Sequence, residues 1–279
     1  MTELRYQRAG VIEYLAAPAL AACGFLVHAF LTRRGGFSRG NYGSLNFSCR
    51  EGDRPEAVAS NWQLLARSFN LDPAQFVVMQ QVHGDRIVVI ADADRPLVPA
   101  PAAIPPEAYA CDALVTDRLG IAIGVKTADC VPLFLVDRVR HVIAAVHAGW
   151  RGTALDIAGQ TVDTFLALFS SRPEDILAAV GPAIGACCYE VDAVVHQALY
   201  FYEAGGESFF RPRAEKDRWM LDLAMVNRRQ LEQRGIPPEN IFSANQCTSC
   251  RRDSFYSHRR DRGLTGRHFN FLMLKTSSV

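Results

Sequence analysis

Three side chains that can bind a transition metal stand beside short apolar runs of the sequence. His83 ends one such run, Cys130 precedes a second, and His147 ends a third. One thiolate and two imidazoles suit zinc or copper better than magnesium or calcium, which prefer oxygen ligands. Three protein ligands also leave one position of a tetrahedral zinc open, which is typical of catalytic sites and not of structural ones.

The spacing of these residues leaves a second interpretation open. Two hydrogen-bonded core histidines and an inert buried cysteine would give the same pattern. The sequence contains neither HExxH nor two CxxC pairs, so no local zinc motif decides between the two interpretations.

The neighbours of the candidate ligands add groups that bind anions or move protons. Gly149 and Gly152 let the backbone approach a ligand closely, and Arg151 between them offers a fork of donors to an anion. Asp129 precedes Cys130 and is a candidate for proton transfer, while the Cys130 thiolate is itself a candidate nucleophile. We therefore expect Cys130, Asp129 and Arg151 to take part in catalysis.

Short apolar runs that alternate with longer amphipathic segments predict an α/β fold with a mixed sheet and helical cover. The predicted strands cover residues 25–31, 76–82, 86–90, 111–117, 121–125, 131–136, 142–146 and 176–180. The predicted helices cover residues 54–69, 155–169, 192–202 and 221–234. Five prolines from Pro96 to Pro106 predict a loop. No repeat or linker divides the chain, so one domain over residues 1–279 is expected.

Composition and charge exclude several classes of protein. The chain has 279 residues with 49% hydrophobic content, which is enough for a large core. Its net charge of +1 gives no general attraction to nucleic acid or to a membrane, so neither is an expected partner. A homo-oligomer is compatible with this composition.

The cysteine content bears on the cellular compartment. Eight cysteines in a chain of this length are too few for a disulfide scaffold, which favours a reducing compartment, the cytoplasm. The segment from Leu20 to Cys23 resembles a lipoprotein cleavage box. Export is nevertheless not expected, because Glu13 and Pro18 interrupt the apolar segment before it.

Two arginine-rich segments are candidates for binding an anion. The segment 32–46 places glycines among Arg33 and two further arginines, as in a loop that wraps a phosphate. The segment 251–267 carries six arginines with few stacking aromatics. Because the chain has no overall basic excess, a compact phosphate site is preferred over RNA binding, with Arg259 and Arg267 as its candidates.

Four further cysteines are interpreted as structural. Cys187 and Cys188 are adjacent, and on a strand such neighbours point to opposite faces and cannot share one ion. Cys247 and Cys250 form one CxxC pair, but the sequence offers no second CxxC to complete a four-ligand zinc site. No metal is therefore expected at either pair.

Six sequence motifs lie between positions 80 and 267. They read QQVHGDRI, CDALVTD, TADCVPLFLVD, AAVHAGWRGT, GPAIGACCYEV, and CTSC followed by FYSHRRDRGLTGR. In that order they resemble the motifs of the YfiH-type laccase-domain family, and the resemblance extends from about Phe25 to the C terminus. Members of this family were first described as multicopper polyphenol oxidases. They are now described as zinc-dependent purine nucleoside phosphorylases that also deaminate adenosine and cleave methylthioadenosine.

The resemblance implies a single-domain layered α/β/β/α sandwich with mixed sheets. It also implies a metal, zinc rather than copper, held by His83, Cys130 and His147. In the family the segment that corresponds to 44–46 lines the nucleoside pocket, so Asn46 joins Arg33 as a candidate substrate ligand. Purine nucleosides and inorganic phosphate are the implied partners.

The implied chemistry has two branches. In phosphorolysis, phosphate held by arginines would attack the ribose C1 carbon as the purine leaves. In deamination, water would attack C6 of adenosine and the amino group would leave as ammonia, with zinc supplying the activation of the water. The HxE and PCxxC signature of zinc nucleoside deaminases is absent, so the sequence does not identify the acid or base of a deamination.

Two alternatives remain open at this point. Cys130 paired with a histidine would make a hydrolase or deamidase that needs no metal. A copper-dependent polyphenol oxidase is less favoured, because seven scattered histidines do not form several histidine-rich sites.

Overall fold

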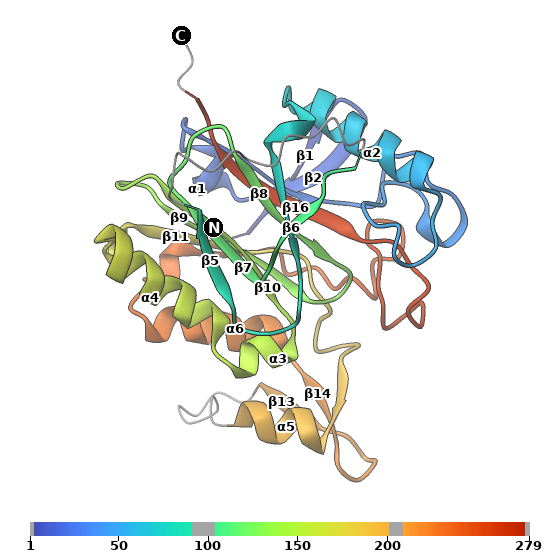
Figure 1. Cartoon of the computed structure of the whole chain (residues 1–279). Coiled ribbons are helices and arrows are strands. Elements are labelled where there is room, and N and C mark those ends of the chain that lie inside the picture. The colour runs from blue at the N-terminus through green and yellow to red at the C-terminus, as the bar shows by residue number, and fades with distance from the viewer. Residues whose placement is uncertain (1–2, 91–103, 201–208, 277–279) are drawn as a thin grey trace.

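The computed structural model describes residues 3–90, 104–200 and 209–276. Its centre is a pair of β-sheets packed face to face, with helices on the outer face of each (Figure 1). The predicted α/β/β/α layering with mixed sheets is therefore confirmed.

The larger sheet has seven strands, in the order β1-β2-β3-β16-β8-β4-β6. Most neighbours in it are antiparallel, but β4 runs parallel to both β6 and β8. The strands are β1 (Arg5–Ala9), β2 (Ile12–Ala16), β3 (Leu26–Leu31), β16 (His268–Leu274), β8 (Ala122–Thr127), β4 (Phe76–Gln80) and β6 (Glu107–Ala110).

The second sheet has six strands, in the order β15-β11-β9-β10-β7-β5. Its central strands β9 and β10 form an antiparallel hairpin, while β5 lies parallel to β7 and β15 parallel to β11. The strands are β15 (Ile241–Ser243), β11 (Ile176–Val180), β9 (Val131–Asp137), β10 (Val142–Ala148), β7 (Ala113–Thr116) and β5 (Ile87–Ile90).

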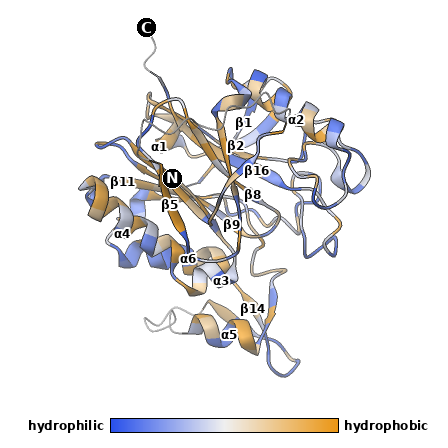
Figure 2. Cartoon of the chain, in the orientation of Figure 1, coloured by the Kyte–Doolittle hydropathy of each residue, from blue (hydrophilic) through white to orange (hydrophobic). Residues whose placement is uncertain are grey.

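The strand β9 shows why its sequence is a continuous apolar run. Phe134 and Val136 point into the core between the two sheets, whereas Val131, Leu133 and Leu135 point to the opposite face, which the helices cover. Because both faces are buried, the strand favours apolar side chains from Val131 to Val136, and only its last residue, Asp137, is charged. Figure 2 shows this apolar character along the strands between the layers.

One helical layer covers each sheet. Helix α2 (Pro55–Ser68) packs Val58, Trp62 and Leu65 against the seven-stranded sheet. Helices α3 (Trp150–Ala154), α4 (Ile157–Phe169) and α6 (Leu223–Gln233) cover the six-stranded sheet (Figure 1). The short helix α1 (Pro18–Ala21) places Leu20 in the core between the sheets.

A small three-stranded sheet extends from this body beside helix α5 (Ala193–Leu199). Its strands follow the order β12 (Glu190–Asp192), β14 (Arg218–Leu221) and β13 (Phe210–Pro212). The sequence analysis did not predict this sheet, nor the β1–β2 hairpin, β6, β15 and β16.

Most of the predicted elements are present with ends shifted by a few residues. The predicted helix 155–169 corresponds to α4, with the separate short helix α3 before it. Most of the predicted proline-rich loop lies outside the described residues, which resume at position 104. None of the helices in the described part of the chain combines the length and apolar character needed to cross a bilayer.

Candidate metal and substrate site

The pairing of the strands brings three distant segments of the chain together at one end of the strands of the six-stranded sheet. Val146 of β10 is paired with Ala113 of β7, so His147 lies opposite Asp112 and donates its backbone N–H to the Asp112 carbonyl at 2.7 Å. On the other side of β10, His147 is paired with Pro132, close to the start of β9. The loop that carries His83 enters beside Asp112, because β5 runs parallel to β7.

The side chains of His83, Cys130 and His147 converge at this end of the strands. One nitrogen from each imidazole and the Cys130 sulfur all lie within 4.8 Å of one another. The two imidazole rings meet edge to face, with their centroids 4.9 Å apart. The structure thus brings together all three residues that the sequence predicted as metal ligands.

Asp112 holds the two histidines in place. Its carboxylate is fully buried and accepts the backbone N–H groups of Val82, His83 and Gly84 at 3.2, 3.0 and 2.7 Å. His83 has a φ of +58°, a left-handed conformation that is uncommon for a residue other than glycine. Three hydrogen bonds to one carboxylate stabilise this conformation.

The same carboxylate also orients His147. Asp112 Oδ1 lies 2.8 Å from His147 Nδ1, which leaves Nε2 of that ring for a ligand. A carboxylate behind a ligating histidine is a common feature of zinc sites. Asp112 lies within the predicted strand 111–117 and was not among the predicted site residues, because aspartates near strand ends most often cap turns. Its position at the start of that strand, in the motif CDALVTD, was the signal available for the orienting role.

Two glycines, Gly149 and Gly152, let the backbone pass close to Cys130 and to the loop that carries His83. A Cβ atom at Gly149 would lie 3.2 Å from the Cys130 sulfur, and one at Gly152 would lie 2.7 Å from the Gly84 carbonyl oxygen. Larger residues at these positions would displace either the thiol or the loop that carries His83.

The charges of the site are coupled. Burial alone would raise the pKa of the Cys130 thiol, but the neighbouring His147 and hydrogen bonds from both histidines outweigh burial and lower that pKa to about 6. Burial likewise opposes a charge on His147, yet Cys130 and Asp112 raise the pKa of its imidazole to about 9. Without a metal, the geometry thus favours a thiolate beside an imidazolium.

The donor set fits a zinc ion. A thiolate and two imidazole nitrogens are ligands that zinc prefers, and Asp112 supplies the outer hydrogen bond that such a site needs. Copper binds the same types of ligand, so the donor atoms alone do not distinguish the two metals.

The three side chains line a cavity of about 410 Å³, a size that suits a small organic ligand. Apolar and aromatic side chains make up part of its lining, namely Trp150, Ile184, Tyr189 and Leu223. Charged side chains form another part, namely Arg50, Glu51, Glu107, Lys126, Asp129, Arg151, Arg259 and Arg267.

Several of these charges neutralise one another. Arg50 and Lys126 both pair with Glu107. Arg267 pairs with Glu51 at 2.9 Å.

Arg151 and Arg259 also line the cavity, but among the described residues they are not paired with a carboxylate as Arg50, Lys126 and Arg267 are. The guanidinium of Arg151 stacks over Trp150, and that of Arg259 stacks over Tyr189 while donating to the Glu190 carbonyl. No ion pair joins either guanidinium to a carboxylate within the described residues. Their charge therefore remains available to an anion.

Asp129 lies on the wall of the cavity, but both of its oxygens are occupied. Oδ1 accepts the Thr248 hydroxyl at 2.6 Å, and Oδ2 accepts the backbone N–H of Arg259 at 2.7 Å. These bonds fasten the C-terminal segment to the Cys130 loop and give Asp129 a positioning role. Its part in proton transfer stays a prediction.

Arg33 and Asn46 lie away from this cavity. Arg33 stacks on Tyr256 and donates to the carbonyls of Gly43 and Arg252, beside a separate surface hollow. Asn46 is fully buried, and its side chain bonds to the backbone of Ser48 and to other interior groups. Of the predicted substrate ligands, the structure brings only Arg259 and Arg267 to the wall of the cavity.

The sequence of the chain matches a known protein family over residues 27–275. That family is described as multi-copper polyphenol oxidoreductase laccase. The chain belongs to this family. The resemblance inferred from six sequence motifs is thereby confirmed.

Relatives in this laccase-domain family carry a different name. The protein named purine nucleoside phosphorylase YlmD of Geobacillus stearothermophilus is 36% identical over 248 residues, which cover 88% of this chain and 89% of that protein. A protein of Deinococcus radiodurans named purine nucleoside phosphorylase is 40% identical, over 92% of this chain and 90% of its own length.

Solved structures of the family share the fold. The crystal structure of YlmD from Geobacillus stearothermophilus superposes with a TM-score of 0.89 at 34% identity, and covers 99% of this chain and 100% of that one. A crystal structure of the Bacillus licheniformis protein YfiH gives a TM-score of 0.87 at 35% identity, over 97% of this chain and 99% of that one.

Asp112→Asn tests the orienting carboxylate. An amide keeps the shape of the side chain but loses the charge behind His147, so zinc affinity should fall about 10- to 100-fold. Competition with a chromophoric chelator measures that affinity. Asp117→Asn is the matched control, because Asp117 is exposed and directly follows β7, the strand that Asp112 precedes. Equal affinities in the two folded variants would show that Asp112 does not support the metal.

The pH dependence of Cys130 alkylation tests the charge coupling. The thiolate is the reactive form, so in zinc-free protein the rate should rise with pH through a midpoint of about 6. Cys23 is the internal comparison, because burial raises the pKa of its thiol above the ordinary value. Peptide mass spectrometry after iodoacetamide treatment reports each residue, and added zinc should protect Cys130. An alkaline midpoint at Cys130 would refute the coupling.

Proposed function

We propose that the chain is a zinc-dependent purine nucleoside phosphorylase that cleaves adenosine, inosine, guanosine and methylthioadenosine, and that it also deaminates adenosine. The observation that carries this proposal is the convergence of His83, Cys130 and His147 on the wall of a cavity that also presents unpaired arginines. The names of the family relatives support the same reaction class. Free thiols throughout the described residues suit a reducing compartment, so we place the enzyme in the cytoplasm.

Phosphorolysis needs an anion site. An oxygen of phosphate forms a bond to the ribose C1 carbon, while the bond from that carbon to the purine nitrogen breaks and the purine leaves with the electron pair. Arg151 and Arg259 are the proposed phosphate ligands, because their guanidinium groups are not committed to carboxylates and lie on the cavity wall. They hold the nucleophile and reduce the repulsion between its charge and the departing electron pair.

The apolar lining suits the other substrate. Ile184 and Leu223 offer aliphatic surface for a planar purine. The rings of Trp150 and Tyr189 add apolar surface where the guanidinium groups of Arg151 and Arg259 do not cover them. When bound by His83, Cys130 and His147, zinc supplies a Lewis acid that polarises an atom of the substrate.

Zinc is preferred over copper for a structural reason. A multicopper oxidase needs several copper sites rich in histidine. In the described part of the chain, the other group of side chains that could bind a metal consists of Cys187, Cys188, Cys247 and Cys250 and contains no histidine. A polyphenol oxidase is therefore the weaker candidate, although the family description names one.

A second candidate function is favoured by the charges of the site. Cys130, His147 and Asp112 are arranged as nucleophile, base and orienting acid, and the lowered pKa of Cys130 favours a reactive thiolate. Such a triad would act as a hydrolase or deamidase without metal. Zinc bound by His83, Cys130 and His147 would block that thiolate, so the two functions exclude each other.

Phosphate dependence tests the proposed reaction. Purified zinc-loaded protein is incubated with adenosine or inosine, with and without phosphate, and the products are separated by liquid chromatography. We expect adenine or hypoxanthine together with ribose 1-phosphate only when phosphate is present, and inosine from adenosine in either case. His83→Ala should abolish both activities while the protein remains folded. Release of free base without phosphate, or full activity after removal of zinc, would contradict the proposal.

Arg151→Ala tests the phosphate site. Loss of a charge-assisted hydrogen bond costs about 1.5–3 kcal/mol, so the KM for phosphate should rise about 10- to 100-fold. The KM for the nucleoside should change little. Arg140→Ala is the matched control, because Arg140 is exposed in the turn between β9 and β10. A rise confined to the nucleoside KM would assign Arg151 to the other substrate.

A further inference from the structure

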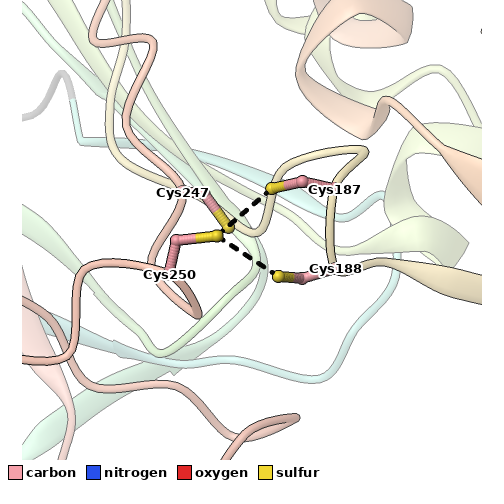
Figure 3. A group of neighbouring side chains, drawn as sticks. All are labelled: Cys187, Cys188, Cys247 and Cys250. Atoms are coloured by element: carbon pink, nitrogen blue, oxygen red, sulfur yellow. Dashed lines mark hydrogen bonds between the residues drawn. The ribbon is translucent and has the colours of Figure 1, made fainter.

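A second group of metal-ligating side chains lies outside the candidate active site. Cys187 and Cys188 follow β11, and Cys247 and Cys250 follow β15, which is the neighbouring parallel strand. Figure 3 shows that these two pairs face each other across a small gap. All four sulfurs lie within 4.8 Å of one another, and Cys250 lies 3.4 Å from both Cys187 and Cys188.

The local backbone explains why adjacent cysteines can point to the same place. Cys187 and Cys188 lie in a turn, in which the backbone N–H groups of Cys188 and Tyr189 both donate to the Gly185 carbonyl. The interpretation of this segment as a strand, with side chains on opposite faces, was therefore wrong. The CxxC pair lies in a second turn, closed by the backbone N–H of Arg251 on the Cys247 carbonyl at 3.1 Å.

Backbone pairing holds these two turns side by side. Ala183 forms an isolated parallel bridge with Cys247, and Thr248 donates its backbone N–H to the Ala183 carbonyl at 3.0 Å. The inference that the CxxC pair lacks partners was also wrong, because the adjacent cysteines 187 and 188 supply them across this bridge.

We propose that Cys187, Cys188, Cys247 and Cys250 form a second, structural zinc site. Four sulfurs bound tetrahedrally at about 2.3 Å from one zinc ion are about 3.8 Å apart, which agrees with the spacing of this group. The sulfurs are too far apart for disulfides, in which the two atoms are about 2.05 Å apart. Four protein ligands leave no position for a substrate, so this site is structural and not catalytic.

The surroundings of the cysteines suit a zinc ion bound by four thiolates. The backbone N–H of Gly185 lies 3.3 Å from the Cys247 sulfur, as an outer hydrogen bond to a ligand. Such a centre has a negative net charge. The guanidinium of Arg211 lies at one of the loops that hold it, since it donates to the Ala186 carbonyl. Arg260 donates to the Thr248 carbonyl in the other loop, although its charge is paired with Asp261.

The position of the site indicates its role. Between Ala183 and Glu190, the loop that carries Cys187 and Cys188 also provides Ile184 and Tyr189, which line the candidate active site. The loop that carries Cys247 also provides Thr248, which binds Asp129 beside Cys130. A zinc ion that joins the two loops would fix one wall of the cavity without taking part in the reaction.

Metal content separates the two sites. Cys130→Ser removes the thiolate of the first site, and this variant should still retain one zinc ion per chain after dialysis against a mild chelator. Adding Cys250→Ser should remove that zinc, whereas adding Cys23→Ser should not, because Cys23 belongs to neither group. Elemental analysis by mass spectrometry measures the zinc.

Cobalt substitution keeps the test valid if the Cys250→Ser variant does not fold. Cobalt in the Cys130→Ser protein should give the strong thiolate-to-metal charge-transfer band and the visible bands of a tetrahedral site with four sulfur ligands. A Cys130→Ser protein without zinc, a cobalt spectrum without that band, or the loss of two free thiols without any metal would overturn the proposal. None of these readouts depends on phosphorolysis, so the failure of one proposal is distinguishable from the failure of the other.

Discussion

The buried carboxylate of Asp112 is the group on which the candidate active site depends. It accepts three backbone N–H groups from the loop that carries His83, and it faces the ring of His147 at 2.8 Å. A buried carboxylate without such partners would be strongly unfavourable, so these bonds stabilise the loop and the ring together. Two of the three candidate metal ligands therefore share one hydrogen-bonding centre.

The register of the six-stranded sheet determines where Asp112 meets the two histidines. The strands β10 and β5 both pair with β7, so the segments that end β10 and precede β5 meet at the start of β7, where Asp112 lies. The start of β9 on the far side of β10 adds Cys130. The apolar core between the two sheets fixes this register, because a shift by one residue would turn every buried side chain of a strand to its other face.

The candidate metal ligands were predictable because their side-chain chemistry is restrictive. Few residue types bind zinc, and His83, Cys130 and His147 all adjoin apolar runs that read as strands. Asp112 was harder to assign, because aspartates near strands most often cap turns and only the register shows what this one contacts. The location of Arg33 and Asn46 away from the cavity was also not predictable, because their side chains bond to backbone groups of a loop about 220 residues later in the chain.

The cysteine pairs illustrate the limits of reasoning from local sequence. Cys187 and Cys188 were assigned to opposite faces on the assumption of a strand, but one turn reverses that conclusion. The CxxC pair seemed incomplete because its partners lie about 60 residues earlier and do not repeat its spacing. For the CxxC pair, the missing information was the parallel pairing of β11 with β15.

The small sheet of β12, β13 and β14 was missed because each strand is short. Strands of three or four residues give too little alternation to be recognised in a sequence. The central strands β9 and β10 were predicted well, because burial on both faces makes their sequences almost entirely apolar. The strand β16 is as long and as buried but was missed, since His268 and Asn270 interrupt its apolar run.

The central claim is that His83, Cys130 and His147 share one zinc ion, and anomalous X-ray diffraction tests it most directly. Crystals of the protein purified without added metal are measured just above and just below the zinc absorption edge. The account predicts a strong anomalous peak, present only above that edge, between the two imidazoles and the Cys130 sulfur. The absence of a peak there, or a peak that follows the copper edge instead, would contradict it.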